Sequence, residues 1–376
     1  MFRDGSPTWA KQPGTSRGRV DRSANRDPLR QSRELADQLP LTDTSDIEYV
    51  LVRVNVAEGR PTALRIKGTS GVHKHRVQPE RLTSPVTERV SRHTIGRSDL
   101  HDLSGRFQQI LVQLLPKLAN MPDKVAPLIS RAETQFGVLL ADDPDAATLE
   151  TRRAAQLSAQ LATGLFRITS RHASGSTEPV ELRFGDTTYR LPSGENHGAH
   201  QGKWLFAFCW ARIARDDDAA GILARYPMSR LRATGDGGLS DEFNHDWVGI
   251  LQKAWLEGPV SVADRTPALD TTSEFGAQRI VDHLLRPPME VFDAIASNDT
   301  TRFNRELANA LELHRSFFDS TEWRNDPAGF VSIPLLGLAC WAHDTHMRLE
   351  VESEYIPAYF IEAPDWMSDL DQAEAK

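Results

Sequence analysis

Two neighbouring stretches near the C-terminus decide the fold: Gly337-Leu338-Ala339-Cys340-Trp341-Ala342-His343-Asp344, and Leu349-Glu350-Val351-Glu352-Ser353-Glu354-Tyr355-Ile356-Pro357. The first is an apolar run that predicts a helix ending in a polar turn. The second alternates apolar and acidic residues, which is typical of a strand whose side chains point to opposite faces. Glu350, Glu352 and Glu354 then share one face, where their charges repel one another. Such a row is fully solvated, held for a cationic partner, or used inside the fold, where a carboxylate caps a helix or pairs with Arg315 or Arg348.

These stretches also resemble a known family. They match the signature "L-A-x-x-A-x-D … E-V-E-S-E-Y-[LI]-P" of the Immunity protein 49 family, which comprises bacterial proteins encoded beside polymorphic toxins and inferred to neutralise them. Further blocks resemble the family in the same order, at residues 91–93, 202–208, 245–256 and 287–314. The resemblance covers roughly residues 88–368. One departure follows Asp344, where the family has a small residue or glycine and this chain has Thr345-His346.

The composition limits the class of protein. The chain has 376 residues, 39% of them hydrophobic, enough for one large domain or two ordinary ones. Residues 1–90 carry 16 Lys and Arg against 11 Asp and Glu, whereas the rest carries 28 against 41. An acidic body disfavours nucleic acid and favours a basic partner through steering, although many proteins are acidic only for solubility.

The chain shows no sign of a membrane segment or an export signal. No apolar run reaches the roughly 18 residues that span a bilayer, and the polar, arginine-rich N-terminus lacks the apolar centre of a signal peptide. Cys209 and Cys340 are the only cysteines, and both stand in apolar surroundings. We therefore expect buried free thiols, no membrane association and a cytoplasmic location.

The first 87 residues differ from the rest. Residues 1–44 are rich in Arg, Ser, Pro, Gly and Asp, which predicts disorder. Residues 47–67 contain two β-rich runs around a turn and predict a hairpin that is marginal unless it docks on something. Because the family begins near residue 91, residues 1–87 are either a low-complexity extension or the product of a mis-assigned start codon, and composition leaves both open. The predicted domain spans residues 88–368, followed by an acidic tail at 369–376.

From Leu100 onward the pattern is helical. Apolar residues recur at three- and four-residue steps, and capping or helix-starting residues precede several of the runs. These signals are Asp143-Pro144, Asp216-Asp217-Asp218, Ser240-Asp241, Pro287-Pro288 and Asn298-Asp299. Residues 180–184 and 187–191 alternate around Gly185-Asp186, which predicts a hairpin with a type II′ turn. The fold class is therefore mainly α: about ten helices, in antiparallel pairs packed into one array, with one inserted β-hairpin.

No complete catalytic motif is present. The glycines before Lys203 have the wrong spacing for a phosphate-binding loop, and Trp204 stands where Ser or Thr is required. Histidine pairs at 73/75, 197/200 and 343/346 lack a third ligand at metal-site spacing. We expect no metal, no cofactor and no catalytic residue. His245, with Asp241 or Asp246, is a candidate general base, for which packing or capping is the simpler role.

The resemblance implies an immunity protein that neutralises a cognate toxin by stoichiometric occlusion, without turnover. The row of carboxylates suggests a toxin with a basic surface, and a nuclease would offer one in its substrate groove. Two other functions remain open: a helical adaptor for a regulatory protein, and a hydrolase that uses His245. Trp204 and Trp247 are predicted to be core residues. The predicted partner-binding residues are Glu350, Glu352, Glu354, Tyr355, Asp344 and Trp366.

Overall fold

Helices make up most of the structure, a computed structural model that describes residues 88–96, 100–234, 241–272 and 278–374. The predicted hairpin at 47–67 and the rest of the extension 1–87 lie outside these residues. The helices are α3 Leu100–Leu114, α4 Val125–Asp142, α5 Leu149–Ala173, α6 Gln201–Ala214, α7 Asp217–Ala224, α8 Met228–Thr234, α9 Glu242–Glu257, α10 Val262–Leu269, α11 Gln278–Ile280, α12 Arg286–Ala296, α13 Thr300–Phe318, α14 Ile333–Asp344, α15 Ala358–Glu362 and α16 Trp366–Glu374. The mainly α prediction is confirmed.

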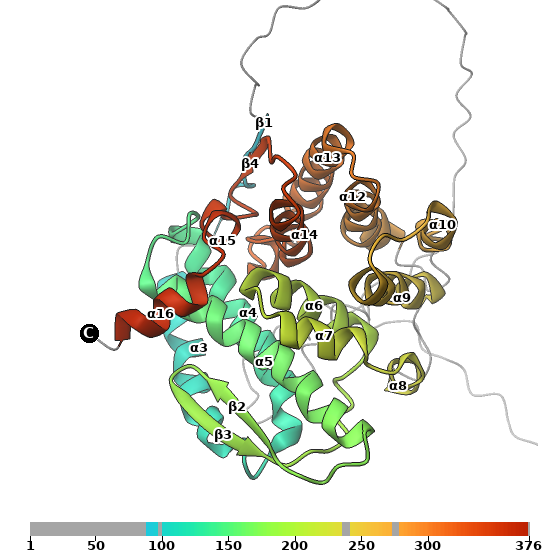
Figure 1. Cartoon of the computed structure of the whole chain (residues 1–376). Helices are drawn as coiled ribbons and strands as arrows, with labels where there is room; N and C mark the ends of the chain where they lie inside the picture. The colour runs from blue at the N-terminus through green and yellow to red at the C-terminus, as the bar shows by residue number, and fades with distance from the viewer. Residues whose placement is uncertain (1–87, 97–99, 235–240, 273–277, 375–376) are drawn as a thin grey trace, which may run out of the picture. The chain divides into compact units, whose positions relative to one another are not determined.

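The long helices pack side by side in one array. In space the order is α3, α4, α5, α6, α14, α12 and α13, each packed against the next (Figure 1). The first four follow the chain, but α14 comes from near the C-terminus and lies between α6 and α12. A late segment of the chain therefore joins the two halves of the array. Among the described residues, no helix is both long enough and apolar enough to cross a membrane.

Local capping explains where several helices begin. The Asp299 carboxylate accepts a hydrogen bond from the Arg302 backbone N–H at 2.9 Å and starts α13, as predicted. Asp216 caps α7 in the same way through the Ala219 N–H at 2.8 Å. These caps satisfy backbone donors that have no partner within the helix.

The helix expected to begin at Asp143-Pro144 begins instead at Leu149, with Thr148 as its N-cap. Asp143 closes α4, and its carboxylate accepts hydrogen bonds from the Ala147 and Thr148 N–H groups. Between the two helices Ala146 has a φ of 53°, which interrupts the helical path. Asp143 thus organises the whole α4–α5 turn, and the prediction of a helix start at this residue was wrong.

Pro287 and Pro288 occupy the first turn of α12, where their missing N–H groups do no harm. The helical path does not start there, because α11 and a π-helical turn, η3 (Val281–Leu285), lead directly into α12. Three single 3₁₀ turns complete the helical elements: η1 Leu115–Lys117, η2 Pro122–Lys124 and η4 Pro327–Gly329.

The inserted hairpin is present where it was predicted. Strands β2 (Val180–Phe184) and β3 (Thr187–Leu191) pair antiparallel, with Phe184 opposite Thr187. Gly185 has a φ of 59°, whereas Asp186 is not among the residues with positive φ, as a type II′ turn requires. The hairpin packs on α5, and the Gly185 N–H donates to Gln160 Oε1 at 2.7 Å.

Gly185→Val should lower the free energy of unfolding by roughly 1–3 kcal/mol, because a β-branched side chain is strained at positive φ. Urea denaturation measures the change. Gly194→Val is the matched control, since Gly194 has no positive φ and open space around its Cα. Equal denaturation midpoints for the two variants would show that the turn is not strained by the side chain.

A second pair of strands was not predicted. Strand β4 (Val351–Ser353) is confined to three residues of the alternating stretch, and it pairs in parallel with β1 (Glu88–Val90). In this register Arg89 lies opposite Glu352. Just after β1, the Arg92 guanidinium donates to the carbonyls of Leu140 and Ala141 at the end of α4. The segment 88–93 is therefore an integral part of the domain.

Deleting residues 1–85 should leave a cooperative thermal transition close to that of the full chain. Deleting residues 1–96 should lower the free energy of unfolding by at least about 2 kcal/mol, because buried Val90 is lost together with the contacts of Arg92 and His93. Calorimetry on both truncations makes the comparison. Loss of the cooperative transition in the shorter deletion would contradict the domain boundary at residue 88.

The core is continuous across the array. Trp204 and Trp247 are buried, as predicted, and so are the free thiols of Cys209 and Cys340, whose pKa values burial raises to about 12. Helices α6 and α14 approach closely at Gly337, where an added Cβ would lie 2.8 Å from Cβ of Cys209. Glycine at this position lets the late helix α14 pack directly on α6.

Candidate partner-binding site

The three glutamates of the alternating stretch lie on the side of β4 that faces away from the core. Glu352 is exposed, and Glu350 and Glu354 are half-buried, whereas Val351 and Tyr355 are fully buried. Alternation therefore separates acidic from apolar side chains as expected. Strand geometry ends at Ser353, and Glu354 belongs to the following turn.

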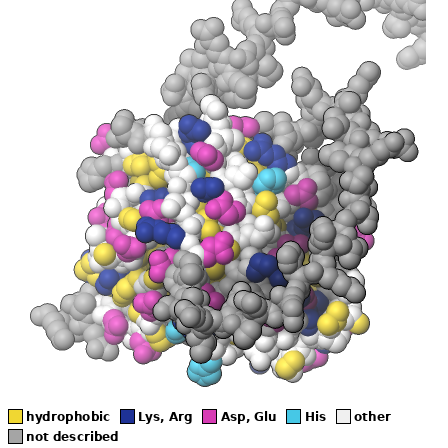
Figure 2. Space-filling view, turned by 90° about the horizontal axis from the view of Figure 1, so that it is seen from above, with side chains coloured by type: hydrophobic (Ala, Val, Ile, Leu, Met, Phe, Trp, Pro, Cys, Tyr) yellow, Lys and Arg dark blue, Asp and Glu magenta, His cyan; other side chains and the backbone are white. Residues whose placement is uncertain are grey.

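Each carboxylate of this row has an arginine residue beside it. Arg348 Nε lies 3.5 Å from Glu350 Oε1, Arg89 stands opposite Glu352 across the strand pair, and the Arg92 backbone N–H donates to Glu354 Oε2 at 3.0 Å. Seen from the side of β1, β4 and α13, dark blue and magenta side chains are interspersed (Figure 2). The surface around the row thus mixes both signs of charge.

Tyr355 lies inside the core, where its hydroxyl forms hydrogen bonds with His93. It accepts a hydrogen bond from the His93 backbone N–H at 2.9 Å and lies 2.9 Å from His93 Nδ1. His93 Nε2 lies 3.0 Å from the Arg324 carbonyl, which can only accept. The ring proton is therefore on Nε2, and the Tyr355 hydroxyl donates to Nδ1. Burial raises the pKa of this hydroxyl.

His314 packs edge-on against the Tyr355 ring and lies 3.2 Å from the Gly329 carbonyl through Nε2. Burial lowers the pKa of His314 to about 4 and also lowers the pKa of His93. Both imidazoles are therefore neutral in the folded protein at neutral pH. Together with Tyr355 they hold residues 91–93 against the C-terminal part of the domain.

The stability of the protein should fall as the pH falls from about 6.5 to about 4. In this window the unfolded chain, with a histidine pKa of about 6.5, binds protons that the folded His314 does not bind. The loss from His314 amounts to about 3 kcal/mol at most. Urea denaturation at several pH values should show a flatter slope for His314→Gln. His197→Gln, at an exposed position, should keep the wild-type slope.

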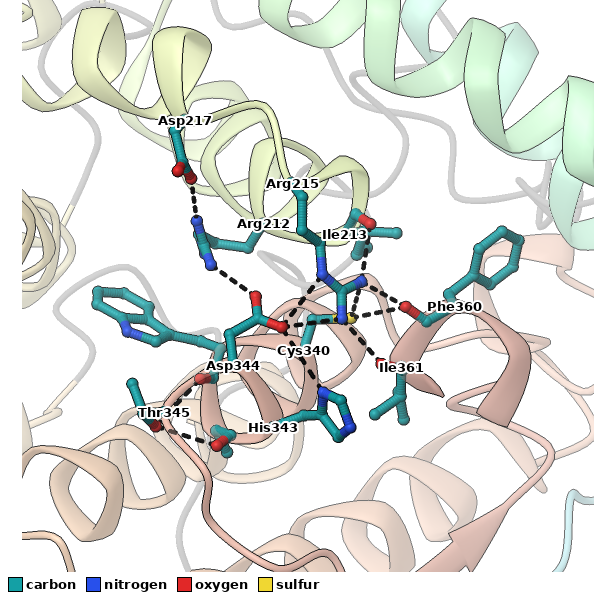
Figure 3. Close-up of polar contacts among 12 residues, drawn as sticks. Arg212, Ile213, Arg215, Asp217, Cys340, His343, Asp344, Thr345, Phe360 and Ile361 are labelled. Atoms are coloured by element: carbon teal, nitrogen blue, oxygen red, sulfur yellow. Dashed lines mark hydrogen bonds and ion pairs between the residues drawn. The ribbon is translucent and has the colours of Figure 1, made fainter. Parts of the chain in front are cut away.

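Asp344 is the centre of an ion-pair network (Figure 3). Arg212 Nη2 lies 2.8 Å from Asp344 Oδ2, and Arg215 Nη2 lies 3.2 Å from Oδ1. Arg212 also pairs with Asp217 at 2.9 Å, and Arg215 donates to the carbonyls of Phe360 and Ile361. The network connects α6, α7, α14 and α15. The Asp344 carboxylate, predicted as a partner contact, is therefore paired with arginines of its own chain.

The turn after Asp344 explains the departure noted in the sequence. The Met347 N–H donates to the Ala342 carbonyl and the His346 N–H to the His343 carbonyl, the hydrogen bonds of a Schellman C-cap. His346 has a φ of 65°, a conformation that favours glycine. The chain keeps the turn geometry with a histidine at the glycine position.

Trp366 is also placed in the core and not on the surface. Its side chain is fully buried, its indole N–H donates to the Ile213 carbonyl at 2.8 Å, and its ring packs edge-on against Phe360. A tryptophan in an acidic C-terminal segment suggested an exposed contact, but the indole fixes α16 to the end of α6.

The sequence of this chain matches a known protein family. A sequence model of the family described as Immunity protein 49 matches residues 143–360, more than half of the chain. The chain belongs to the Immunity protein 49 family. No curated protein and no solved structure matched it.

The family match is shorter than the range 88–368 over which the motifs were found. It contains the hairpin, the Asp344 network and strand β4, but neither β1 nor the Ser91-Arg92-His93 block. The arginine residues beside Glu352 and Glu354 therefore come from outside the matched range.

His245, the candidate general base, lies on α9 of this immunity-family domain. Its side chain is 7% exposed, and its Nδ1 lies 3.8 Å from Glu242 Oε2, which in turn binds Arg232. Burial lowers the pKa of His245. A general base is oriented by a second group at hydrogen-bond distance, and the Glu242 contact is longer than that. Among the described residues, no three His, Cys, Asp or Glu side chains are grouped to hold a metal ion.

Sequence reasoning missed Arg212 and Arg215. Both lie at the end of α6, where basic residues are favoured by the helix dipole, and this signal was available. Their pairing with Asp344, more than 120 positions later, was not, because no local spacing encodes it.

Proposed function

We propose that this chain is an immunity protein that binds a cognate polymorphic toxin and neutralises it by stoichiometric occlusion. It would act in the cytoplasm of the producing bacterium, without catalytic turnover. The observation that carries the proposal is the membership of the Immunity protein 49 family over residues 143–360.

Of the predicted partner-binding residues, Glu350 and Glu352 are proposed to contact the toxin directly. Glu352 is exposed and Glu350 half-buried on one side of β4, so both are accessible to a basic surface of the toxin. Charges of this kind speed association and disfavour wrong partners more than they add affinity. Asp344, Tyr355 and Trp366 contribute indirectly in this proposal, by holding α14, β4 and α16 in place.

The toxin is expected to be the product of the neighbouring reading frame. Expressed alone it should arrest growth, and co-expression of this chain should restore growth. Titration of the purified proteins should give full neutralisation at a molar ratio of about one, because occlusion consumes one immunity protein per toxin. Rescue far below that ratio would indicate an enzyme, and the absence of both rescue and binding would favour an adaptor.

Glu350→Gln/Glu352→Gln should slow association with a basic toxin and weaken the salt dependence of the on-rate. Its unfolding free energy should change by less than about 1 kcal/mol, as exposed ion pairs contribute little. Stopped-flow kinetics and urea denaturation provide the two measurements. Glu178→Gln/Glu181→Gln, two exposed changes at the β2–β3 hairpin, is the control for net charge.

Glu354→Ala separates the internal role from the external one. The Glu354 carboxylate accepts the Arg92 N–H, and alanine removes this acceptor, so the variant should lose stability and leave the on-rate unchanged. If Glu350→Gln/Glu352→Gln lowered stability while association stayed at the wild-type rate, the row would be structural and not part of the interface.

A further inference from the structure

The β2–β3 hairpin has an outer edge, on β3, without a neighbouring strand. Its sheet consists of these two strands, and β2 is the strand that packs on α5. In a hairpin with a two-residue turn, the pair that flanks the turn is hydrogen-bonded, and hydrogen-bonded pairs then alternate with pairs that are not. Thr187, Tyr189 and Leu191 therefore bond to β2. The N–H and C=O groups of Thr188 and Arg190 point to the outer edge.

These outward groups are open to another strand. Thr188 and Arg190 are exposed, and among the described residues neither makes a backbone hydrogen bond beyond the hairpin. Proteins often protect such an edge with lysine, proline or a bulge, and β3, Thr-Thr-Tyr-Arg-Leu, has none of the three. An unprotected edge of this kind is suited to the addition of a strand.

The sequence of β3 lets this edge pair with itself in one register. A twofold axis at Tyr189 places Thr188 opposite Arg190 of a second copy, so that every outward N–H meets a C=O. An axis at Arg190 would set two arginines directly opposite and would pair Thr188 with Pro192, which has no N–H. An axis at Thr188 would pair Arg190 with Asp186, which lies in the turn and not in a strand.

The side chains also fit the register centred on Tyr189. On the exposed face, Arg190 has its own Glu181 on one side and Thr188 of the second copy on the other, so no like charges stand directly opposite. On the other face, the half-buried Tyr189 ring lies 5.6 Å from the Phe184 ring and would meet Tyr189 of the second copy. Aromatic residues at a non-hydrogen-bonded pair are close together and stabilise paired strands.

From this edge we infer that the protein forms a homodimer, in which the β3 strands of two copies pair antiparallel around Tyr189 and join the two hairpins into one sheet. Strands of five residues make a small interface, so the dimer is weak and depends on concentration. Figure 1 shows the hairpin at the opposite end of the domain from β1 and β4. Glu350 and Glu352 therefore stay accessible in both copies.

Sedimentation equilibrium of the full chain at increasing concentrations should show a monomer–dimer equilibrium. Thr188→Pro removes the outward N–H in both copies but keeps the hydrogen bonds to β2, so it should raise the dissociation constant at least about tenfold. Arg190→Pro should act in the same way. Thr188→Val is the matched control, because valine keeps the N–H and suits a strand, and it should dimerise like the wild type. Urea denaturation of every variant checks that the domain is folded.

Disulfide cross-linking tests the register. Residues that face each other at a non-hydrogen-bonded pair have Cα atoms about 4.5 Å apart, which suits a disulfide. Tyr189→Cys should therefore give a covalent dimer on oxidation. Thr187→Cys, which lies opposite Leu191 of the second copy, should not. The native Cys209 and Cys340 are buried and do not compete.

A chain that stays monomeric at every concentration would overturn the inference, and so would a dimer that the folded Thr188→Pro and Arg190→Pro variants retain. Equal cross-linking of Tyr189→Cys and Thr187→Cys would overturn it as well, because the register would be wrong. If the chain is monomeric and Thr188→Pro weakens binding of the neighbouring gene product, the edge accepts a strand of the toxin and not a second copy. The sedimentation and cross-linking experiments contain no toxin, so their failure leaves the proposed function standing.

Discussion

The pairing of Asp344 with Arg212 and Arg215 is the interaction on which the arrangement of the helices depends. The two arginines stand at the end of α6, and the carboxylate ends α14, so the contact fixes the late helix at its place in the array. Removing one partner of this mostly buried network would leave a charge without its counter-charge, which is unfavourable. Arg215 adds the carbonyls of α15 to the same contact. Four elements thereby share one electrostatic centre.

What the sequence predicted well was local. Asp299 could be identified as a cap because its acceptor and the donor that it binds are three residues apart. Gly185 could be placed in a turn because only a few residues around it set the geometry. Asp143 misled for the same reason: its carboxylate serves several nearby donors, and the pattern alone does not say which helix it closes.

What the sequence did not predict was the pairing of distant segments. The alternation at 349–355 indicated a strand but not its partner, which is β1, more than 250 residues earlier. Arg348 could be named as a partner of the acidic row because it is close in sequence, but Arg89 and Arg92, which also lie beside the row, could not. The sequence also did not show whether Tyr355 and Trp366 are exposed or buried. Aromatic side chains with a polar atom suit both an interface and a core that supplies a hydrogen-bond partner.

The parallel pair of β1 and β4 has a consequence for how the protein is made. Residues 88–93 leave the ribosome early, but their partners, β4 and Tyr355, are synthesised about 260 residues later. The residues at the end of α6 likewise form their contacts with Asp344 and Trp366 only after these two have been synthesised. The core thus closes only after nearly the whole chain has been released, and non-local closure of this kind is slow. A protein built in this way has no complete core while it is still being translated. Under the proposed function, a cell must therefore finish the chain before the toxin becomes active.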